Sequence, residues 1–542
     1  MSPLVPLLIL TVGAVGLLLG LLPRFRYTGL ISVTAAAGAL AALLMLALDL
    51  PAHALLSAWS PPSLFSVPLE LEVDSLAWLF ALALLVVTLA TLVTGLARPG
   101  GSRVGVRAAM LLLTVACLMS IFSGNLVTRI VAWALLDVIY FLTFIGLRDD
   151  EGVAPQAVLN LAFNTAGTLA AVGAAVLISR TSATLSLRDA ALTAQSTLLI
   201  TLAAIFRLGL FPLHLGQPTA VSLGQGLGTL LRIAPAVVAL ETISRLSEYG
   251  FPPSVGPWLT LFACAAALVG AVQLWSTADP RQGIAYLVIA QSGVALMAGL
   301  WGGAQSALTL MATVLSLALG AALIYLSNGH DDRQRWTTVL PIVGVAAIAG
   351  APLTIGFLGA GWLFGNLVMA GGWGWLALAA LILAQTLLIA GLLYTVFWLY
   401  QPLETQPVLT AVFYAGLSLP AVLLILLALF AGVIGDAVAV SELGMLGFNG
   451  LTSLTGLGVV LVTVAGGIAI WRFDAPLRDR LGGLSASSLA SLGRLDWLYR
   501  LVWGLIRSIG SAVNGLAGVL EGEGAILWAL VAGILVWLLW QG

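Results

Sequence analysis

The sequence contains no lysine, and all 21 of its basic residues are arginine. Only 8% of its 542 residues are charged, which is too few to cover the surface of a soluble domain of this size. The composition therefore excludes the soluble globular class. The two cysteines, Cys117 and Cys264, both lie in apolar runs, so we expect structural thiols and neither a disulfide nor a metal site.

What the chain has instead is apolar sequence, with 61% hydrophobic residues. Because a membrane-spanning helix needs about 20 apolar residues, we predict an all-α polytopic membrane protein with about sixteen spans. The predicted starts lie near residues 3, 27, 75, 106, 125, 155, 195, 220, 256, 281, 305, 337, 374, 407, 452 and 524.

The distribution of arginine predicts how the chain is oriented. The first apolar run, Pro3 to Leu22, lacks the basic start and the small-residue cleavage site of a signal peptide, so we expect it to remain as a span. Arginines in connections gather on the cytoplasmic side of membrane proteins. Of those assigned to connections, fifteen fall on one side and only four on the other: Arg129, Arg180, Arg188 and Arg245. The first connection is then cytoplasmic, both termini are outside, and residues 49–74 form an outer loop in which Glu70 and Glu72 are expected to be solvated.

The stretch from residue 195 to residue 245 organises the rest of the chain. It is apolar enough for a bilayer, yet it holds Arg207, His214, Arg232 and Glu241, with a Pro/Gly break between Phe211 and Pro218. Because charges inside a membrane usually face protein or a water-filled cavity, this stretch indicates a transport site. Glu241 and Arg245 stand four residues apart in the order that favours a helical ion pair, and we predict a structural pair.

Asp137 and His214 each leave two interpretations open. Asp137 lies about 18 Å along its helix from Asn125, close to the middle of the membrane. It is either a functional or paired carboxylate or a neutral aspartate of the core. His214 follows the helix break, where a histidine bonded to the backbone and a proton relay are both reasonable.

A second Pro/Gly break follows 140 residues after the first, at GAPLTIGF, residues 350–357. Two interrupted helices in corresponding positions are typical of transporters built from repeats, with the breaks near the site. The two halves differ chemically, because no charged residue or histidine lies between Arg281 and His330 or between Arg335 and Glu404. The polar residues there are neutral: Tyr286, Gln291, Ser292, Ser316 and Gln385.

We predict six segments along the chain. After N-terminal spans in residues 1–105, two repeats are expected at 106–250 and 251–400, with C-terminal spans at 401–471. A cytoplasmic segment then covers 472–523, and the last span covers 524–542. Within the cytoplasmic segment, apolar residues recur at intervals of three and four over residues 484–520, which predicts an amphipathic helix.

Four motifs resemble the antiporter-like, proton-translocating membrane subunits of respiratory complex I (NADH:quinone oxidoreductase), a family shared with cation/proton antiporter complexes and membrane-bound hydrogenases. The resemblance covers about residues 70 to 400 and rests on NLVTRIVAW (125–133), FPLH (211–214), DPRQGIAYLVIAQSG (279–293) and GAPLTIGF (350–357). It implies two inverted five-helix repeats with discontinuous seventh and twelfth helices. The final two spans and the helix between them look like the distal, largest member of the family, although residues 484–520 would reach only about 55 Å as one helix.

The departures from the family pattern bear on its proton path. The family uses a glutamate after the tryptophan, where this chain has Ala134 with Asp137 one turn later. Its lysine positions correspond to Arg207 and Arg232 in the first half, and to positions near Gly320 and at Ala360 in the second. Lowering the pKa of a lysine from about 10.4 to 7 takes roughly 5 kcal/mol, and an arginine needs at least about 7.5 kcal/mol. Arg207 and Arg232 are therefore expected to be poor proton carriers, and Asp137 is the expected partner of Arg207.

Three functions follow as candidates. The first is a membrane subunit of a complex I-like assembly with a degenerate proton path and a structural or coupling role. The second is a cation/proton antiporter-type or anion (bicarbonate-linked) transporter subunit on the same scaffold, with Asp137, Arg207, His214 and Arg232 as ion-path candidates. The third, an independent enzyme, is disfavoured because no nucleotide fingerprint, metal cluster or nucleophile with a base is visible.

The expected partners are other membrane subunits and the lipid bilayer of a bacterial-type inner membrane, with no nucleic acid. No catalytic residue or cofactor is expected in this chain, and NADH or quinone chemistry would belong to partner subunits.

Overall fold

The computed structural model describes most of the chain. The described residues are 1–20, 27–56, 67–98, 103–146, 153–182, 184–187, 192–214, 225–277, 280–327, 338–397, 406–437, 450–474, 525–541 and eight positions between 500 and 514. The chain forms two compact units, Met1–Leu481 and Gly482–Gly542. The finer segment boundaries stay predictions.

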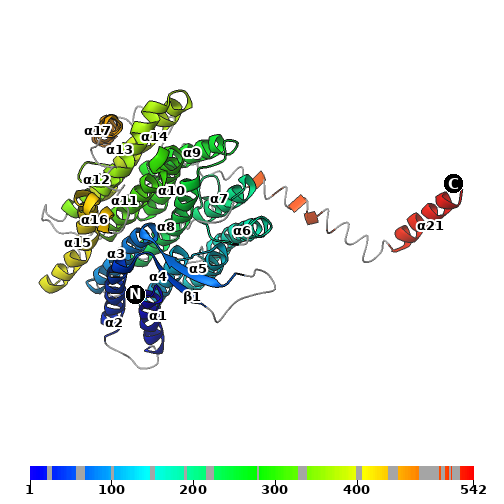
Figure 1. The fold of residues 1–542 in the computed structure, drawn as a ribbon, viewed down its shortest axis with the longest axis horizontal. Coiled ribbons are helices and arrows are strands. Elements are labelled where there is room, and N and C mark those ends of the chain that lie inside the picture. Colours follow the sequence, from blue (N-terminus) through cyan, green and yellow to red (C-terminus); the bar gives the residue numbers. More distant parts are fainter. Residues whose placement is uncertain are drawn as a thin grey trace. The chain divides into compact units, whose positions relative to one another are not determined.

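The first unit is a bundle of helices (Figure 1). The N-terminal helices are α1 (Leu4–Leu19) and α2 (Thr28–Leu46), followed by the short η1 (Ala47–Asp49). The first half continues with α3 (Ser75–Leu96), α4 (Val104–Ile121), α5 (Leu126–Ile145), α6 (Val153–Ser179), α7 (Ala194–Leu208) and α8 (Gln225–Tyr249).

The second half begins with α9 (Gly256–Ser276) and α10 (Pro280–Trp301), followed by η3 (Gly303–Gln305). It continues through α11 (Ser306–Ser327), α12 (Val339–Ile348), α13 (Ile355–Ala370), α14 (Trp373–Phe397), α15 (Pro407–Leu429), α16 (Ala431–Ala437) and α17 (Leu451–Arg472). In the second unit α21 covers Ala525–Gln541, and the eight described positions between 500 and 514 are helical. The rest of the predicted amphipathic helix lies outside the described residues.

Each predicted span start lies near an observed helix start. The largest difference is at α8, predicted near residue 220 and beginning at Gln225. In the described part of the chain, 12 helices are long and apolar enough to cross a membrane, and four shorter apolar helices accompany them: α1, α7, α12 and α13. The polytopic helical fold is confirmed, whereas the count of sixteen spans and the inverted repeats stay predictions.

The predicted outer loop is partly wrong, because it contains a strand pair. Strand β1 (Ala52–Leu56) pairs antiparallel with β2 (Leu69–Val73), with His53 opposite Glu72. Side chains on a strand point alternately to its two faces. In β2, Leu69, Leu71 and Val73 are buried, and Glu70 and Glu72 between them are half-buried and not fully solvated as predicted. We call the end of the bundle where these strands lie the hairpin end; α3 and α5 begin there and α8 ends there.

The break between α12 and α13 is confirmed. Gly350 has φ 73° and Leu353 has φ 67°, so the backbone turns through the left-handed region twice before Thr354 precedes the new helix. A Cβ added to Gly356 would lie 1.8 Å from the carbonyl oxygen of Ala347, so glycine is needed where α13 passes the end of α12. The first break follows α7, which ends at Gly209 (φ 55°); residues 215–224 lie outside the described chain.

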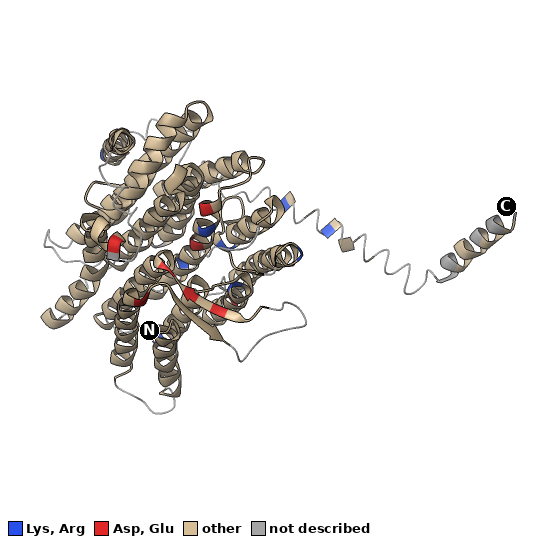
Figure 2. Cartoon of the chain, in the orientation of Figure 1, with Lys and Arg blue, Asp and Glu red and all other residues tan. Residues whose placement is uncertain are grey.

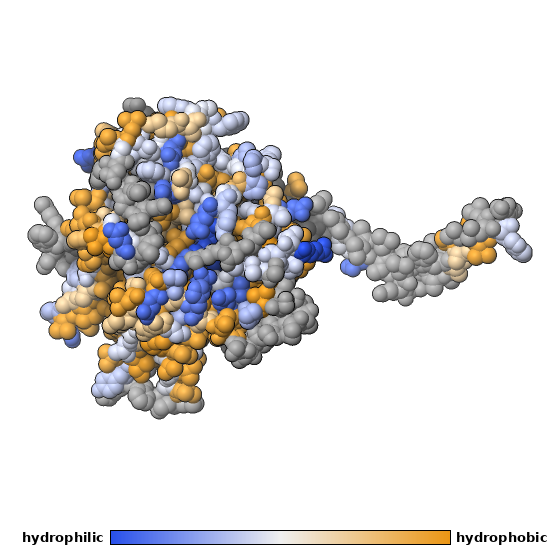
Figure 3. Space-filling view, in the orientation of Figure 1, coloured by the Kyte–Doolittle hydropathy of each residue, from blue (hydrophilic) through white to orange (hydrophobic). Residues whose placement is uncertain are grey.

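The surface and the interior divide as the composition predicts. Large apolar side chains are exposed on outer helices, such as Val12 on α1 and Val408 on α15, and orange apolar residues spread over the flanks in Figure 3. Figure 2 shows that most of the ribbon carries no charge and that red and blue positions gather near the strands and the helices beside them. Those few interior charges define the candidate site.

Two glycines of α17 offer a matched test of the packing between α13 and α17. A Cβ on Gly456 would lie 1.8 Å from the carbonyl oxygen of Gly361, whereas nothing lies within 4 Å of a Cβ on Gly458. We expect Gly456→Ala to destabilise the protein by about 1 to 3 kcal/mol through overpacking. Gly458→Ala should be neutral or stabilising, by up to about 1 kcal/mol. Thermal unfolding of both variants in detergent checks this, and equal melting temperatures would contradict the packing.

Candidate functional site

A buried ion pair joins α5 to α7 in the first half. Arg207 donates from Nη1 to Oδ1 of Asp137 at 2.7 Å and from Nη2 to Oδ2 at 2.9 Å. The side chains are only 1% and 6% exposed. The predicted partnership of these two residues is therefore present, in the two-bond geometry that suits a guanidinium and a carboxylate.

Local sequence explains why Arg207 stands at this place. Gly209 takes a left-handed conformation and ends α7, which leaves Arg207 in the last turn, where a positive charge is favoured by the helix dipole. Its guanidinium lies 4.6 Å from the ring centroid of Trp133 and donates to Thr168 Oγ1 at 3.3 Å. Contacts from α5 and α6 therefore hold the arginine in one position.

Ala134, which stands where the family has its glutamate, is exposed on the surface of α5. Asp137 lies almost one turn further along and points into the bundle, where it is 6% exposed. The acid of this chain thus lies on a neighbouring, inward face of the same helix, and not at position 134, where the resemblance implies the family glutamate. This shift brings it against Arg207 with both carboxylate oxygens engaged.

Arg232 lies on α8 and is 3% exposed. Electrostatic interactions connect it to Tyr140 on α5 and Tyr325 on α11, which belong to the first and the second half. His214 is 7% exposed and stacks on Phe211, with ring centroids 5.6 Å apart. The role of these residues in an ion path stays a prediction.

The second half contains a neutral counterpart at its helix break. Gln291 on α10 donates to the carbonyl oxygen of Ile348, the last residue of α12, at 3.4 Å and lies 3.5 Å from Oε1 of Gln385 on α14. Both distances are long for hydrogen bonds. Close packing occupies the positions that the resemblance assigns to the second-half lysines: a Cβ on Gly320 would lie 2.9 Å from the carbonyl oxygen of Gly344, and Ala360 is buried. No ionisable group replaces the missing lysines at these positions.

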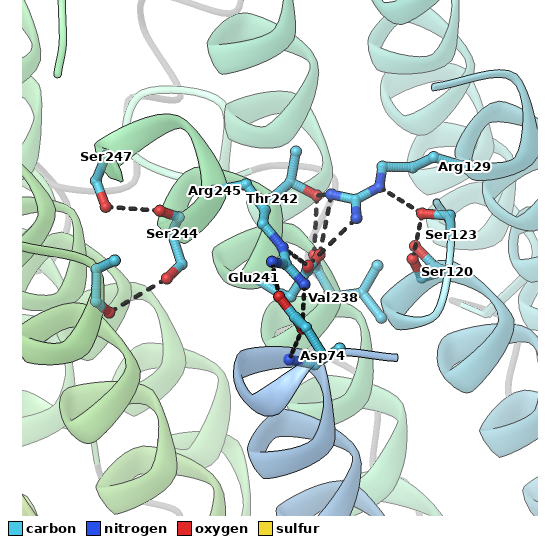
Figure 4. Close-up of polar contacts among 12 residues, drawn as sticks. Asp74, Ser120, Ser123, Arg129, Val238, Glu241, Thr242, Ser244, Arg245 and Ser247 are labelled. Carbon is cyan, nitrogen blue, oxygen red and sulfur yellow. Dashed lines mark hydrogen bonds and ion pairs between the residues drawn. The ribbon is translucent and has the colours of Figure 1, made fainter. Parts of the chain in front are cut away.

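A larger group of charges lies at the hairpin end (Figure 4). The predicted Glu241–Arg245 pair is present, with Arg245 Nε 2.9 Å from Glu241 Oε1. Arg129 from α5 reaches the same carboxylate, with Nη1 2.9 Å from Oε2. Arg245 also contacts both oxygens of Asp74, the residue that caps the start of α3. We call these four residues the four-charge cluster.

The prediction for this region was incomplete. Arg129 was assigned to a connection, yet it lies inside α5 and is 1% exposed, and Arg245 lies within α8 and is 7% exposed. Asp74 was not selected at all. A signal existed, because Asp74 directly precedes an apolar run, which is the position of a helix N-cap. Its pairing with Arg245, 171 residues away, had no signal in the local sequence.

No three His, Cys, Asp or Glu side chains gather into a possible metal site within the described residues. Cys117 and Cys264 are free thiols, buried and partly buried. The charged groups described in the first half form two ion networks.

The Asp137–Arg207 pair can be tested by a double-mutant cycle. Asp137→Ala should destabilise the protein by about 3 to 5 kcal/mol, because it leaves Arg207 buried without its counter-charge. Adding Arg207→Met should recover most of that loss, since a buried neutral pair costs little. Thermal unfolding of the three variants measures the coupling, and additive losses would show that the two side chains do not depend on each other.

Comparison with known proteins places this geometry in context. No family model matches the chain. NADH-quinone oxidoreductase subunit N 1 of Solidesulfovibrio magneticus is 30% identical over 271 residues, which cover 45% of this chain and 56% of that protein. Subunit N of Neisseria gonorrhoeae is 24% identical over 307 residues, covering 48% and 61%. The chain thus spans less than two thirds of the length of these relatives.

Solved structures show the same fold. The Mrp complex from Dietzia sp. DQ12-45-1b matches with a TM-score of 0.79 at 20% identity, over 99% of this chain and 62% of that one. The archaeal membrane-bound sulfane sulfur reductase matches with a TM-score of 0.72 at 16% identity, over 99% of both chains. Respiratory complex I from Thermus thermophilus matches with a TM-score of 0.64 at 18% identity, over 85% of this chain and 100% of that one.

These sequence relatives are N subunits, so the predicted likeness to the distal, largest member has no support from them and stays a prediction. Helical architecture and shared fold agree. The chain is a polytopic helical membrane protein that shares the fold of these solved structures and is similar over part of its sequence to NADH-quinone oxidoreductase subunit N.

Proposed function

We propose that this chain is a membrane subunit of a complex I-like assembly that keeps the antiporter scaffold but has a degenerate proton path. Its role is then structural, or it couples neighbouring subunits to one another. The relatives named above are NADH-quinone oxidoreductase subunits, which supports this kind of assembly. NADH and quinone chemistry belong to partner subunits in this proposal.

The observation that carries the proposal is the state of the Asp137–Arg207 pair. A proton relay needs a group that takes up and releases protons near neutral pH, and arginine remains protonated in proteins. Arg207 engages both oxygens of Asp137, so neither carboxylate oxygen is left to accept a proton without breaking a buried ion pair. This arrangement favours a fixed link between α5 and α7 over a switching one.

The second half supports the same conclusion. From Gln282 to Ser327 and from Thr338 to Phe397, which includes the helix break, the sequence has no charged residue and no histidine. Gln291 and Gln385 can orient water, but an amide does not exchange protons by ionising. Along α11, α12 and α13 the sequence offers no Asp, Glu, His, Lys or Arg to continue a proton path beyond Arg232.

The finer setting is part of the proposal. The membrane is a bacterial-type inner membrane, both termini lie outside, and the neighbours are other membrane subunits and lipid. The excess of arginine in the connections assigned to one side supports this orientation. Apolar side chains exposed on α1, α15 and α17 are compatible with lipid or with apolar faces of neighbours.

The test compares proton uptake by vesicles that hold the purified complex, with the native chain and with Arg207→Lys. We expect an intact complex and the same number of protons per electron in both, since the pair stays in place and takes no part in transport. Subunit composition on a native gel is the control for assembly.

Two outcomes contradict the proposal. A collapse of proton uptake in an intact Arg207→Lys complex would place Arg207 in a working path. An uptake of labelled bicarbonate or chloride that is lost in the same variant would support the alternative, an anion transporter subunit on this scaffold.

A further inference from the structure

We propose that the four-charge cluster, with the β1–β2 strand pair beside it, is a permanent seal that closes the hairpin end of the first half to water and protons. The proposal concerns a barrier within this chain and goes beyond the assignment to an assembly. It rests on three features: the order of the charges, the way the strands are fastened, and the position of the cluster on α8.

The charges of the cluster alternate, and both carboxylate oxygens of Glu241 lie within 3.2 Å of an arginine nitrogen. Oε1 lies 2.9 Å from Arg245 Nε and accepts from Arg129 Nη2 at 3.2 Å, and Oε2 lies 2.9 Å from Arg129 Nη1. Arg129 also donates from Nη1 to Thr242 Oγ1 at 2.8 Å and from Nε to Ser123 Oγ at 2.8 Å. Figure 4 shows this chain of contacts running from Asp74 through Glu241 to Arg129 and Ser123.

Burial follows the same order. Glu241 is 0% exposed, Arg129 1%, and the side chains of Arg245 and Asp74 are 8% and 14% exposed. Asp74 therefore lies nearest the surface and Glu241 deepest. The network crosses the seam between α3, α5 and α8 from rim to interior, with a charge-assisted bond at each step.

The strands are fastened over this seam by bonds to the turn between α4 and α5. Glu72 donates its backbone N–H to the carbonyl oxygen of Phe122 at 2.6 Å, and Gly124 donates to that of Glu70 at 2.9 Å. Asn125 donates from Nδ2 to the carbonyl oxygen of Pro68 at 2.8 Å. These bonds fix β2 to the same turn that holds Ser123, the last contact of Arg129.

The position of the cluster makes it a barrier. Glu241 follows Arg232 by nine residues on α8, or about 13.5 Å along the helix. A water file that follows α8 from Arg232 to the hairpin end must pass Arg129, Glu241 and Arg245. The barrier lies in the closed chain of ion pairs and hydrogen bonds, which leaves these side chains almost no exposed surface, and not in a net charge, because two arginines face two carboxylates.

A clamp without a sealing role makes a different prediction. If the cluster only holds three helices together, its removal lowers stability while the seam stays dry. If it is a seal, its removal admits water. Chemical access to a position just inside the cluster therefore separates the two.

The test uses Val238→Cys, one turn inward of Glu241 at a fully buried position, in a chain with Cys117→Ala and Cys264→Ala, assembled in its complex. The probe is a water-soluble maleimide, and His53→Cys on β1, with a native side chain 51% exposed, gives the rate for full access. We expect no labelling of Val238→Cys in the otherwise native chain. The double change Arg129→Gln with Glu241→Gln, which keeps the Asp74–Arg245 pair, should raise the labelling rate at least about tenfold through local opening.

Asp49→Asn is the matched control, because it removes a carboxylate that is 55% exposed and lies outside the cluster; labelling should stay at the native level. Rapid labelling of Val238→Cys in the otherwise native chain overturns the proposal and needs no cluster variant to fold. A folded double variant that labels no faster than native overturns it as well and leaves a clamp. Neither result depends on proton uptake by the complex, so the seal and the proposed function fail separately.

Discussion

A charge that leaves water needs an opposite charge beside it, and the first half of this bundle is arranged around that requirement. Six charged side chains meet it in two networks: Asp137 with Arg207, and Asp74, Glu241, Arg129 and Arg245 together. Each network contains as many carboxylates as arginines, so each is formally neutral, and each joins helices that are distant in sequence. The helices α3, α5, α7 and α8 are therefore fixed by where their charges must find partners, in addition to apolar packing.

Because the chain has no lysine, the cations in these networks are all arginine. A buried lysine can lose its proton and become neutral, so a lysine pair can switch, whereas arginine keeps its charge and presents a planar fork. Arg207 uses that fork on both oxygens of Asp137. The second half needs no buried ion pair, because its helix break carries no charge. Gln291 and closely packed glycines lie there instead. Both solutions favour a stable scaffold over a relay.

The sequence predicted most of the helices and the Asp137–Arg207 pair, because hydropathy and helix breaks are local patterns and because only a few charges lie in the apolar stretches. It did not predict the strand pair, whose five-residue strands are too short to stand out in an apolar chain. It also placed Arg129 in a connection, since its position near a predicted helix start suited a loop. The contact between Asp74 and Arg245 depends on the three-dimensional arrangement, and no spacing rule connects residues 171 positions apart.

Contacts at its two ends bind α3 to both halves of the bundle. At its start, Asp74 caps the first turn and is bound by Arg245 from α8. Just beyond its last turn, Arg98 donates to the carbonyl oxygen of Leu326, near the end of α11, at 2.5 Å. The guanidinium of Arg98 also lies 5.9 Å from the ring centroid of Phe413 on α15. Burial lowers the pKa of Arg98 to about 10, so the guanidinium stays protonated at neutral pH and remains a donor to the end of α11. Helix α3 is thus fastened at one end to the first half and at the other to the second. Such a doubly fastened helix is compatible with the structural or coupling role proposed for the chain.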